Sequence, residues 1–187
     1  LLVGLPPQVA LGQEKIVSTL GTVAAIRNFL QESRIVWRVA ILGIPFSLAG
    51  AYAGAHLILM IDADIVAKLL LVLIPIGIVL FLIPKNRGAK QAARQGMMLY
   101  LLIPLVCLFV GFYDGFFGPG TGSFLIFLFV RFFGFDFLHA SASAKVVNVA
   151  TNLAALAYFL PHGYVLPLLA GGMAVANVCG SLVGTRL

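Results

Sequence analysis

Residues 111–123 read GFYDGFFGPGTGS, and this stretch interrupts an apolar run that starts at 97 and resumes over 124–135. Pro119 lacks a backbone N–H and the surrounding glycines leave the backbone free, so a continuous helix is disfavoured. Non-helical backbone at membrane depth is tolerated only inside protein or beside a wet cavity. We therefore predict a broken or re-entrant helix, with 124–135 too short to cross a bilayer alone. The alternative is a glycine-rich kink that serves only close helix contact.

The composition around this stretch is that of a membrane protein. Apolar residues make up 61% of the chain and charged residues 10%, and the mean hydropathy is +1.10. Soluble domains carry about 25% charged residues. The sequence therefore predicts an all-α polytopic membrane protein. The expected segments lie at 8–31, 36–58, 64–84, 97–117, 124–135, 139–161 and 165–187.

An internal repeat organises these segments. Residues 4–57 and 134–187 align without a gap, with identical residues at Gly4/Gly134, Ala10/Ala140, Lys15/Lys145, Val17/Val147, Ala24/Ala154, Ala25/Ala155, Phe29/Phe159, Leu30/Leu160, Ala40/Ala170, Gly50/Gly180, Gly54/Gly184 and Leu57/Leu187. We predict two homologous repeats of transmembrane helices. The first covers 1–84 with its opening segment missing, and the second covers 96–187 with its last helix missing. Duplicated helix sets are typical of secondary transporters.

The basic residues predict which side of the membrane the segments face. Lys85, Arg87, Lys90 and Arg94 cluster between the halves, which marks 85–95 as a cytoplasmic loop. The net charge of +6 is accounted for by such loops rather than by a nucleic-acid surface. If 97–135 is a hairpin, the two repeats are inverted; if it is one broken crossing, they are parallel. The uncharged connection before the last segment favours inversion.

Two lysines stand out because a charge at membrane depth is costly unless it is paired or functional. Lys145 shares one helix face with Ser141, Asn148 and Asn152, at spacings of four, three and four residues. Lys15 is followed by Ser18 at the position equivalent to Asn148. A cation flanked by hydroxyls and amides can hold an oxyanion such as a sulfonate. The alternative is that each lysine pairs with a carboxylate or reaches an interface.

The glycine-rich break adds further candidates for substrate binding. The half-helix that follows it should present free backbone N–H groups to an anion, from Gly118, Gly120, Thr121, Gly122 and Ser123, with Thr121 or Ser123 as the cap. Asp114, just before the break, is a candidate to neutralise a lysine or to carry a proton. Glu14 points about 100° away from Lys15 around the helix, which predicts a separate helix-end charge.

These motifs resemble the sulfite exporter TauE/SafE family of membrane permeases. The resemblance rests on Gly-Leu-Pro-Pro-x-Val-Ala-Leu-Gly at 4–12 leading into a lysine-bearing helix, on Ile-Val-Trp-Arg at 35–38, and on the glycine-rich break before the equivalent second helix. It implies export of small sulfur-containing anions, such as sulfite or sulfoacetate, by about eight membrane segments. The first glycine-rich segment of that pattern is absent here, so half of any symmetric site lies outside this chain.

The sequence thus predicts a secondary transporter of small sulfur-containing anions, in the bacterial inner membrane, with a small anion and the lipid bilayer as partners. We expect no enzyme, cofactor, metal site or nucleic-acid partner, because no catalytic, metal-ligand or phosphate-loop pattern is found. The alternatives are a non-transporting scaffold for assembly of a redox or maturation complex, in which lysine and aspartate pair structurally, and an anion channel.

Overall fold

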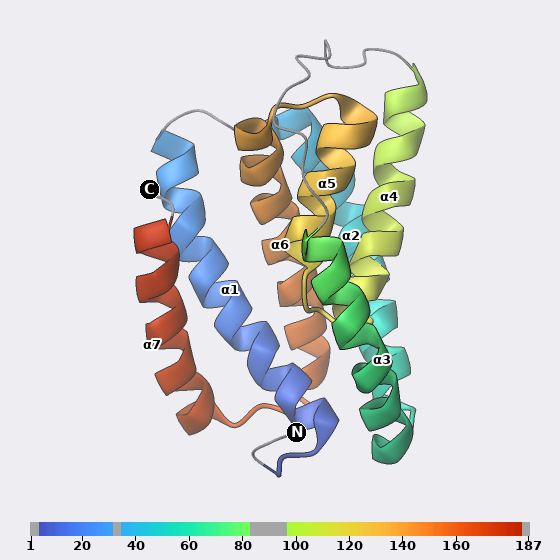
Figure 1. Cartoon of the computed structure of the whole chain (residues 1–187), viewed down its shortest axis with the longest axis vertical. Helices are drawn as coiled ribbons and strands as arrows, with labels where there is room; N and C mark the ends of the chain where they lie inside the picture. Colours follow the sequence, from blue (N-terminus) through green and yellow to red (C-terminus); the bar gives the residue numbers. More distant parts are fainter. Residues whose placement is uncertain (1–3, 32–34, 83–96, 185–187) are drawn as a thin grey trace.

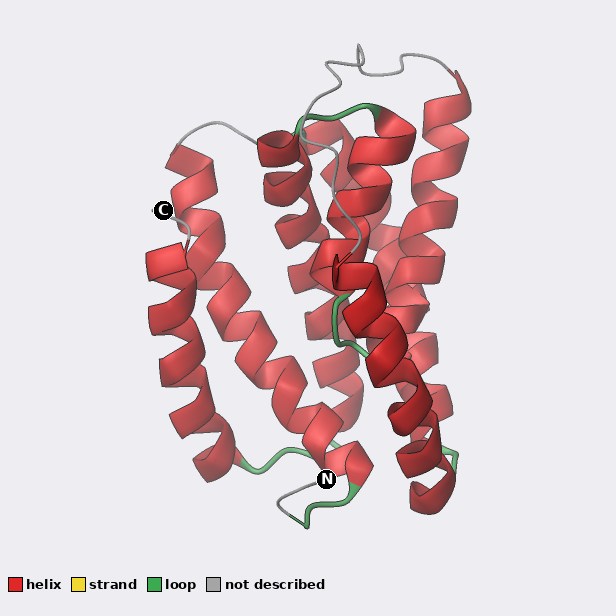
Figure 2. Ribbon diagram, viewed as in Figure 1, coloured by secondary structure: helices red, strands yellow, loops and turns green. Residues whose placement is uncertain are grey.

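The computed structural model describes residues 4–31, 35–82 and 97–184, and within these ranges every regular element is a helix (Figures 1 and 2). The helices are α1 (Pro7–Gln31), α2 (Trp37–Leu59), α3 (Ala63–Leu82), α4 (Met97–Phe116), α5 (Thr121–Phe133), α6 (Phe137–Phe159) and α7 (Pro167–Gly184). The prediction of an all-α chain is confirmed, and the predicted segment boundaries agree with the helices to within three residues where both are described. The predicted basic loop at 85–95 lies outside the described residues.

Two helices, α2 and α4, approach so closely that glycine is required on both. A Cβ added at any of four glycines would lie 1.9 to 2.4 Å from a backbone oxygen of the facing helix. The four contacts are Gly50 with Leu108, Gly54 with Phe112, Gly111 with Ser47, and Gly115 with Ala51. Gly50 and Gly54 thus form a small-residue face on α2, and Gly111 and Gly115 form the facing pair on α4.

Two apolar clusters fill the space between the helices. One is built on α2, α4, α5 and α6, and includes Ile103, Leu125 and Phe129. The other is built on α1, α2, α3 and α6, and includes Ile58 and Phe159. The most polar predicted segment, α1, also turns polar side chains inward: its buried residues include Gln13, Lys15 and Thr19. α1 therefore turns these polar side chains toward the other helices.

The glycine-rich stretch turns the chain back on itself. In Figure 1, α4 descends from the end of the bundle at which it begins, and α5 climbs back toward the same end. Gly118 and Gly120 in the turn have φ values of +89° and +84°, which favour glycine. α5 has 13 residues, about 20 Å at helical rise. It is therefore too short to cross a bilayer alone, as expected, and it begins three residues earlier than predicted.

The helices that the predicted repeat pairs with one another run in opposite directions. Figure 1 shows α1 and α6 antiparallel to one another, and α2 and α7 likewise. The contacts obey the same correspondence, in which α1 matches α6 and α2 matches α7. α1 packs against α7, α6 packs against α2, and α1 and α6 contact each other. Swapping the two repeats leaves this set of contacts unchanged.

Among the described residues, two helices have the length and composition to cross a membrane, Trp37–Leu59 and Pro167–Gly184. Two shorter apolar helices lie at Tyr100–Phe116 and Thr121–Phe133. Length and apolarity are thus consistent with a membrane protein.

A carboxylate fixes the start of α6. The Asp136 side chain accepts hydrogen bonds from the backbone N–H groups of Leu138 (3.0 Å) and His139 (3.1 Å), and contacts the His139 ring. Partial burial raises the pKa of Asp136, but these hydrogen bonds and the nearby histidine lower it more, so the pKa lies below its ordinary value.

We expect Asp136→Ala to lower stability by about 1 kcal/mol, as loss of a helix cap does. Because the folded-state pKa is lowered, the stabilisation is present at neutral pH and is lost as the pH falls through that pKa. Thermal melts of wild type and Asp136→Ala at neutral and acidic pH test this. A difference that does not shrink in acid would contradict it.

Candidate functional site

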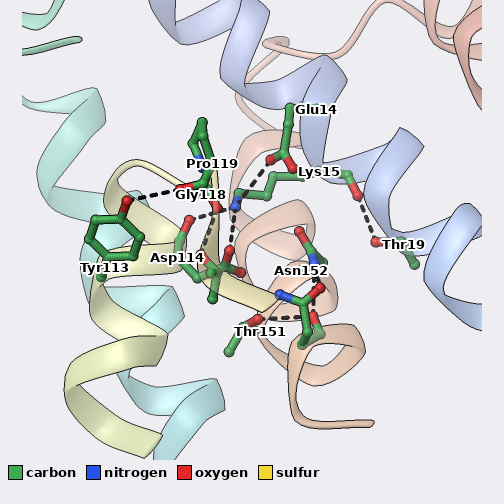
Figure 3. A network of polar contacts seen from close by, with 11 residues as sticks. Glu14, Lys15, Thr19, Tyr113, Asp114, Gly118, Pro119, Thr151 and Asn152 are labelled. Carbon is green, nitrogen blue, oxygen red and sulfur yellow. Dashed lines mark hydrogen bonds and ion pairs between the residues drawn. The ribbon is translucent and has the colours of Figure 1, made fainter. Parts of the chain in front are cut away.

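The centre of the site is Lys15, whose side chain is 1% exposed. Its Nζ lies 3.1 Å from Asp114 Oδ1 and 3.2 Å from Glu14 Oε2. Nζ also donates a hydrogen bond of 2.5 Å to the backbone oxygen of Asp114. Asp114 is itself buried, at the last turn of α4 before the glycine-rich turn. A lysine and an aspartate 99 positions apart therefore form a buried ion pair (Figure 3).

The glycine-rich turn closes against this ion pair. A Cβ on Gly118 would lie 2.5 Å from Lys15 Nζ, so a larger residue would push the ammonium group aside, and the φ of +89° also favours glycine here. Tyr113 Oη donates to Pro119 O at 2.9 Å, and Thr121 Oγ1 donates to Gly118 O at 2.6 Å. Figure 3 shows Tyr113 bridging to the turn beside the lysine. The turn is thereby held in one shape next to the charge.

The first residues of α5, which follow this turn, include backbone N–H groups that make no hydrogen bond with the described residues. Gly120 is the N-cap and no side chain caps the helix, so the predicted cap by Thr121 or Ser123 is wrong. The Thr121 hydroxyl instead tightens the turn. Phe124 N–H donates to Gly120 O, whereas the N–H groups of Gly122 and Ser123 have no acceptor among the described residues. Such groups favour an anion.

A polar patch on α6 lies near the ion pair. Asn152 is fully buried and donates to Asn148 O (2.8 Å) and Asn148 Oδ1 (3.2 Å). Thr151 Oγ1 also donates to Asn148 O, at 2.9 Å. The two asparagines predicted from the sequence are therefore together and buried, and Figure 3 shows Asn152 and Thr151 near the Lys15 cluster. Asn152 Oδ1 stays without a hydrogen-bond partner among the described residues.

The two lysines occupy different surroundings. Lys145 is half-buried, its Nζ lies 5.9 Å from the centre of the Phe29 ring, and it forms no ion pair with a described residue. Ser18, also half-buried, hydrogen-bonds to the Glu14 side chain. Of the predicted residues, the structure joins Lys15, Asp114, the glycine-rich turn and, through Glu14, Ser18, and leaves Lys145 outside that network.

Sequence reasoning missed one member of the network. Glu14 was expected to be a separate helix-end charge, and this is wrong because its carboxylate contacts Lys15 Nζ. The two Cβ atoms do diverge around the helix, but both side chains are long enough to bend toward the turn at Gly118. Two acidic groups thus share one buried lysine. The only sequence signal was the adjacency of the two charges within an apolar segment.

Comparison with known proteins assigns a family. The family model for the sulfite exporter TauE/SafE matches residues 1–187. A protein of Haemophilus influenzae named "probable membrane transporter protein" is 35% identical over all of this chain and 73% of its own length. "Probable membrane transporter protein YfcA" of Escherichia coli K12 is 33% identical, over 98% of this chain and 68% of its own.

A further relative, "probable membrane transporter protein ORF9" of a Sinorhizobium species, is 33% identical over all of this chain and 71% of its own length. No solved structure matches. The lysine-bearing helices, the glycine-rich turn and the match along the whole sequence lead to one assignment: this chain belongs to the sulfite exporter TauE/SafE family of membrane proteins.

Proposed function

We propose that the chain is part of a secondary transporter that moves small sulfur-containing anions, such as sulfite or a sulfonate, out of the cytoplasm across the bacterial inner membrane. The observation that carries this proposal is the buried Lys15 held against the glycine-rich turn. A charge at such depth is costly and is typically retained for function. The family match and the relatives' names support a membrane transporter rather than an enzyme.

In this proposal the anion binds between the start of α5 and the polar face of α6. The free N–H groups of Gly122 and Ser123 would contact its oxygens. Lys145, which has no carboxylate partner among the described residues, would supply attraction. Asn148 and Asn152 would orient the anion, and Lys15 with Ser18 would line the opposite wall. Asp114 would hold Lys15 in place, and the acidic groups around Lys15 would couple transport to a proton.

The helix directions support an inverted repeat. α4 and α5 form a hairpin and the equivalent helices run antiparallel, as expected if 97–135 re-enters from one side of the membrane. In such folds the two halves alternate access to a central site. Gly180 and Gly184 of α7, equivalent to Gly50 and Gly54 of α2, have no neighbour within 4 Å of an added Cβ. The repeat predicts that a helix equivalent to α4 covers them.

We therefore expect Gly180→Leu to destabilise the full-length protein, although the variant meets no clash among the described residues. Folded yield and melting temperature in detergent measure this effect, with Gly171→Leu on the same helix as control. Equal behaviour of the two variants would count against the inverted repeat.

One observation favours a second candidate. The Lys15–Asp114 pair is also what a non-transporting scaffold would show, with both charges serving only helix contact. An anion channel is a third possibility, since its flux would ignore a proton gradient. The three functions separate on two properties: whether an anion binds at all, and whether a proton gradient drives its movement.

The deciding experiment is the melting temperature of the purified full-length protein with added sulfite, thiosulfate or a sulfonate. At about 100 times its dissociation constant a ligand stabilises by roughly 2.7 kcal/mol. We expect this gain in wild type and in Lys68→Ala, whose lysine is exposed on α3, and its loss in Lys145→Ala. An equal rise in melting temperature in Lys145→Ala would rule out an anion site at Lys145. No rise in any of the three proteins would favour the scaffold.

A further inference from the structure

The cluster around Lys15 holds more acid than base. Glu14 and Asp114 each lie within ion-pair distance of the one ammonium group, at 3.2 and 3.1 Å. No other ion pair reaches either carboxylate among the described residues. With all three groups ionised the cluster would carry one net negative charge at membrane depth. Such an uncompensated charge is strongly disfavoured in a low-dielectric interior.

The same cluster also lacks hydrogen-bond donors. Three buried side-chain atoms have no hydrogen-bond partner among the described residues, and all three are oxygens: Glu14 Oε2, Asp114 Oδ2 and Asn152 Oδ1. The nearby hydroxyls leave these oxygens without a donor: Tyr113 donates to Pro119 O, the neighbouring threonines donate to backbone oxygens, and Ser18 contacts the Glu14 side chain but leaves Oε2 without a partner. Charge and hydrogen bonding therefore point to the same missing component, a proton.

The geometry indicates which carboxylate takes the proton. Lys15 Nζ donates two hydrogen bonds to Asp114, one to its backbone oxygen and one to Oδ1. Toward Glu14 the ammonium makes an ion-pair contact only. The Asp114 side chain is 2% exposed and the Glu14 side chain 36%. Asp114 is thus the fixed partner of the lysine, and Glu14 is the less committed and more accessible acid.

We propose that Glu14 is a proton-carrying residue: it holds one proton beside the ionised Lys15–Asp114 pair, and an anion binds at the adjoining turn while that proton is held. The step is simple protonation, in which one O–H bond of a hydronium ion breaks and one O–H bond forms on a Glu14 carboxylate oxygen. The titratable groups that face the cluster are Lys15 on the same helix, and Asp114 and Tyr113 on α4. α6 contributes the uncharged Asn152.

Coupling follows from charge. An anion that arrives beside Gly118 adds negative charge to a cluster that already has an excess, and a proton on Glu14 offsets it. Binding of the proton then raises the affinity for the anion, and binding of the anion raises the affinity for the proton by the same factor. The two would therefore cross the membrane together. The coupling of anion and proton rests on the proposed function, whereas the protonation of Glu14 does not.

Infrared difference spectroscopy of the full-length protein tests the proton count without any substrate. We expect a protonated-carboxyl band at neutral pH that shifts on ¹³C labelling of glutamate carboxyls and not of aspartate carboxyls. The band is lost in Glu14→Gln and kept in Glu32→Gln, which removes the other glutamate of this chain. A missing band, or one that shifts with the aspartate label, would overturn the assignment.

Thiosulfate, which does not titrate near neutral pH, tests the coupling. Its affinity for wild-type full-length protein should fall by about tenfold per pH unit once the pH is high enough for the infrared band to disappear, whereas its affinity for Glu14→Gln should stay constant over the same range. Wild-type affinity that does not change across the pH at which the band is lost would overturn the coupling. If thiosulfate and sulfonates do not bind at all, the proposed function fails. The infrared band still shows whether Glu14 is protonated. A band that disappears on adding Na⁺ would show that a metal cation, not a proton, balances the cluster.

Discussion

Gly115→Leu is expected to abolish accumulation of the folded protein. Gly115 lies on α4 where a Cβ would sit 1.9 Å from the backbone oxygen of Ala51 on α2. A backbone atom cannot move aside as a flexible side chain can, so the two helices would have to separate. Separation would also undo the contacts of Gly50, Gly54 and Gly111, which lie along the same pair of helices.

The expected loss is large because helices in a membrane associate by close fit rather than by exclusion of water. Inserting even a few methylenes into a well-filled contact costs about 1–3 kcal/mol and sometimes more. Here the whole α2–α4 contact is lost. Expression with a fluorescent tag, followed by size-exclusion chromatography in detergent, measures the folded fraction. Gly171→Leu, at a glycine with nothing within 4 Å, should elute as wild type does, and normal elution of Gly115→Leu would refute the prediction.

The second large effect is expected for Lys15→Met. This variant keeps the length of the side chain but leaves the buried Asp114 without its cation. Breaking a buried ion pair by removing one partner costs about 3–5 kcal/mol, because the remaining charge is uncompensated. We expect a correspondingly lower melting temperature and no anion transport by reconstituted full-length protein.

A double variant separates the structural role of the pair from its functional role. Lys15→Met with Asp114→Asn removes both charges, so stability should return in large part while transport stays absent. If the double variant transports anions at the wild-type rate, Lys15 and Asp114 serve only the fold. If Lys15→Met alone is as stable as wild type, the ion pair does not contribute as its geometry implies.

The resemblance of the two halves illustrates how far sequence reasoning reached. Lys15 and Lys145 are equivalent in the repeat, and the sequence predicted equivalent roles for them. In the structure Lys15 is enclosed by two carboxylates, and Lys145 is half-buried near Phe29. Equivalent positions share a helix face, but the groups that meet that face come from other helices, which are not equivalent among the described residues.

The helices, the polar character of α1 and the short helix after the glycine-rich stretch can be predicted from the sequence alone. These follow from local properties: apolar length, the missing N–H of proline and the backbone freedom of glycine. Three features are visible only in the tertiary structure. Asp114 contacts Lys15 across 99 positions, Glu14 contacts the same ammonium group, and Gly118 leaves room for that group. Helical periodicity says which residues share a face, whereas an ion pair depends on which faces meet and how far long side chains bend.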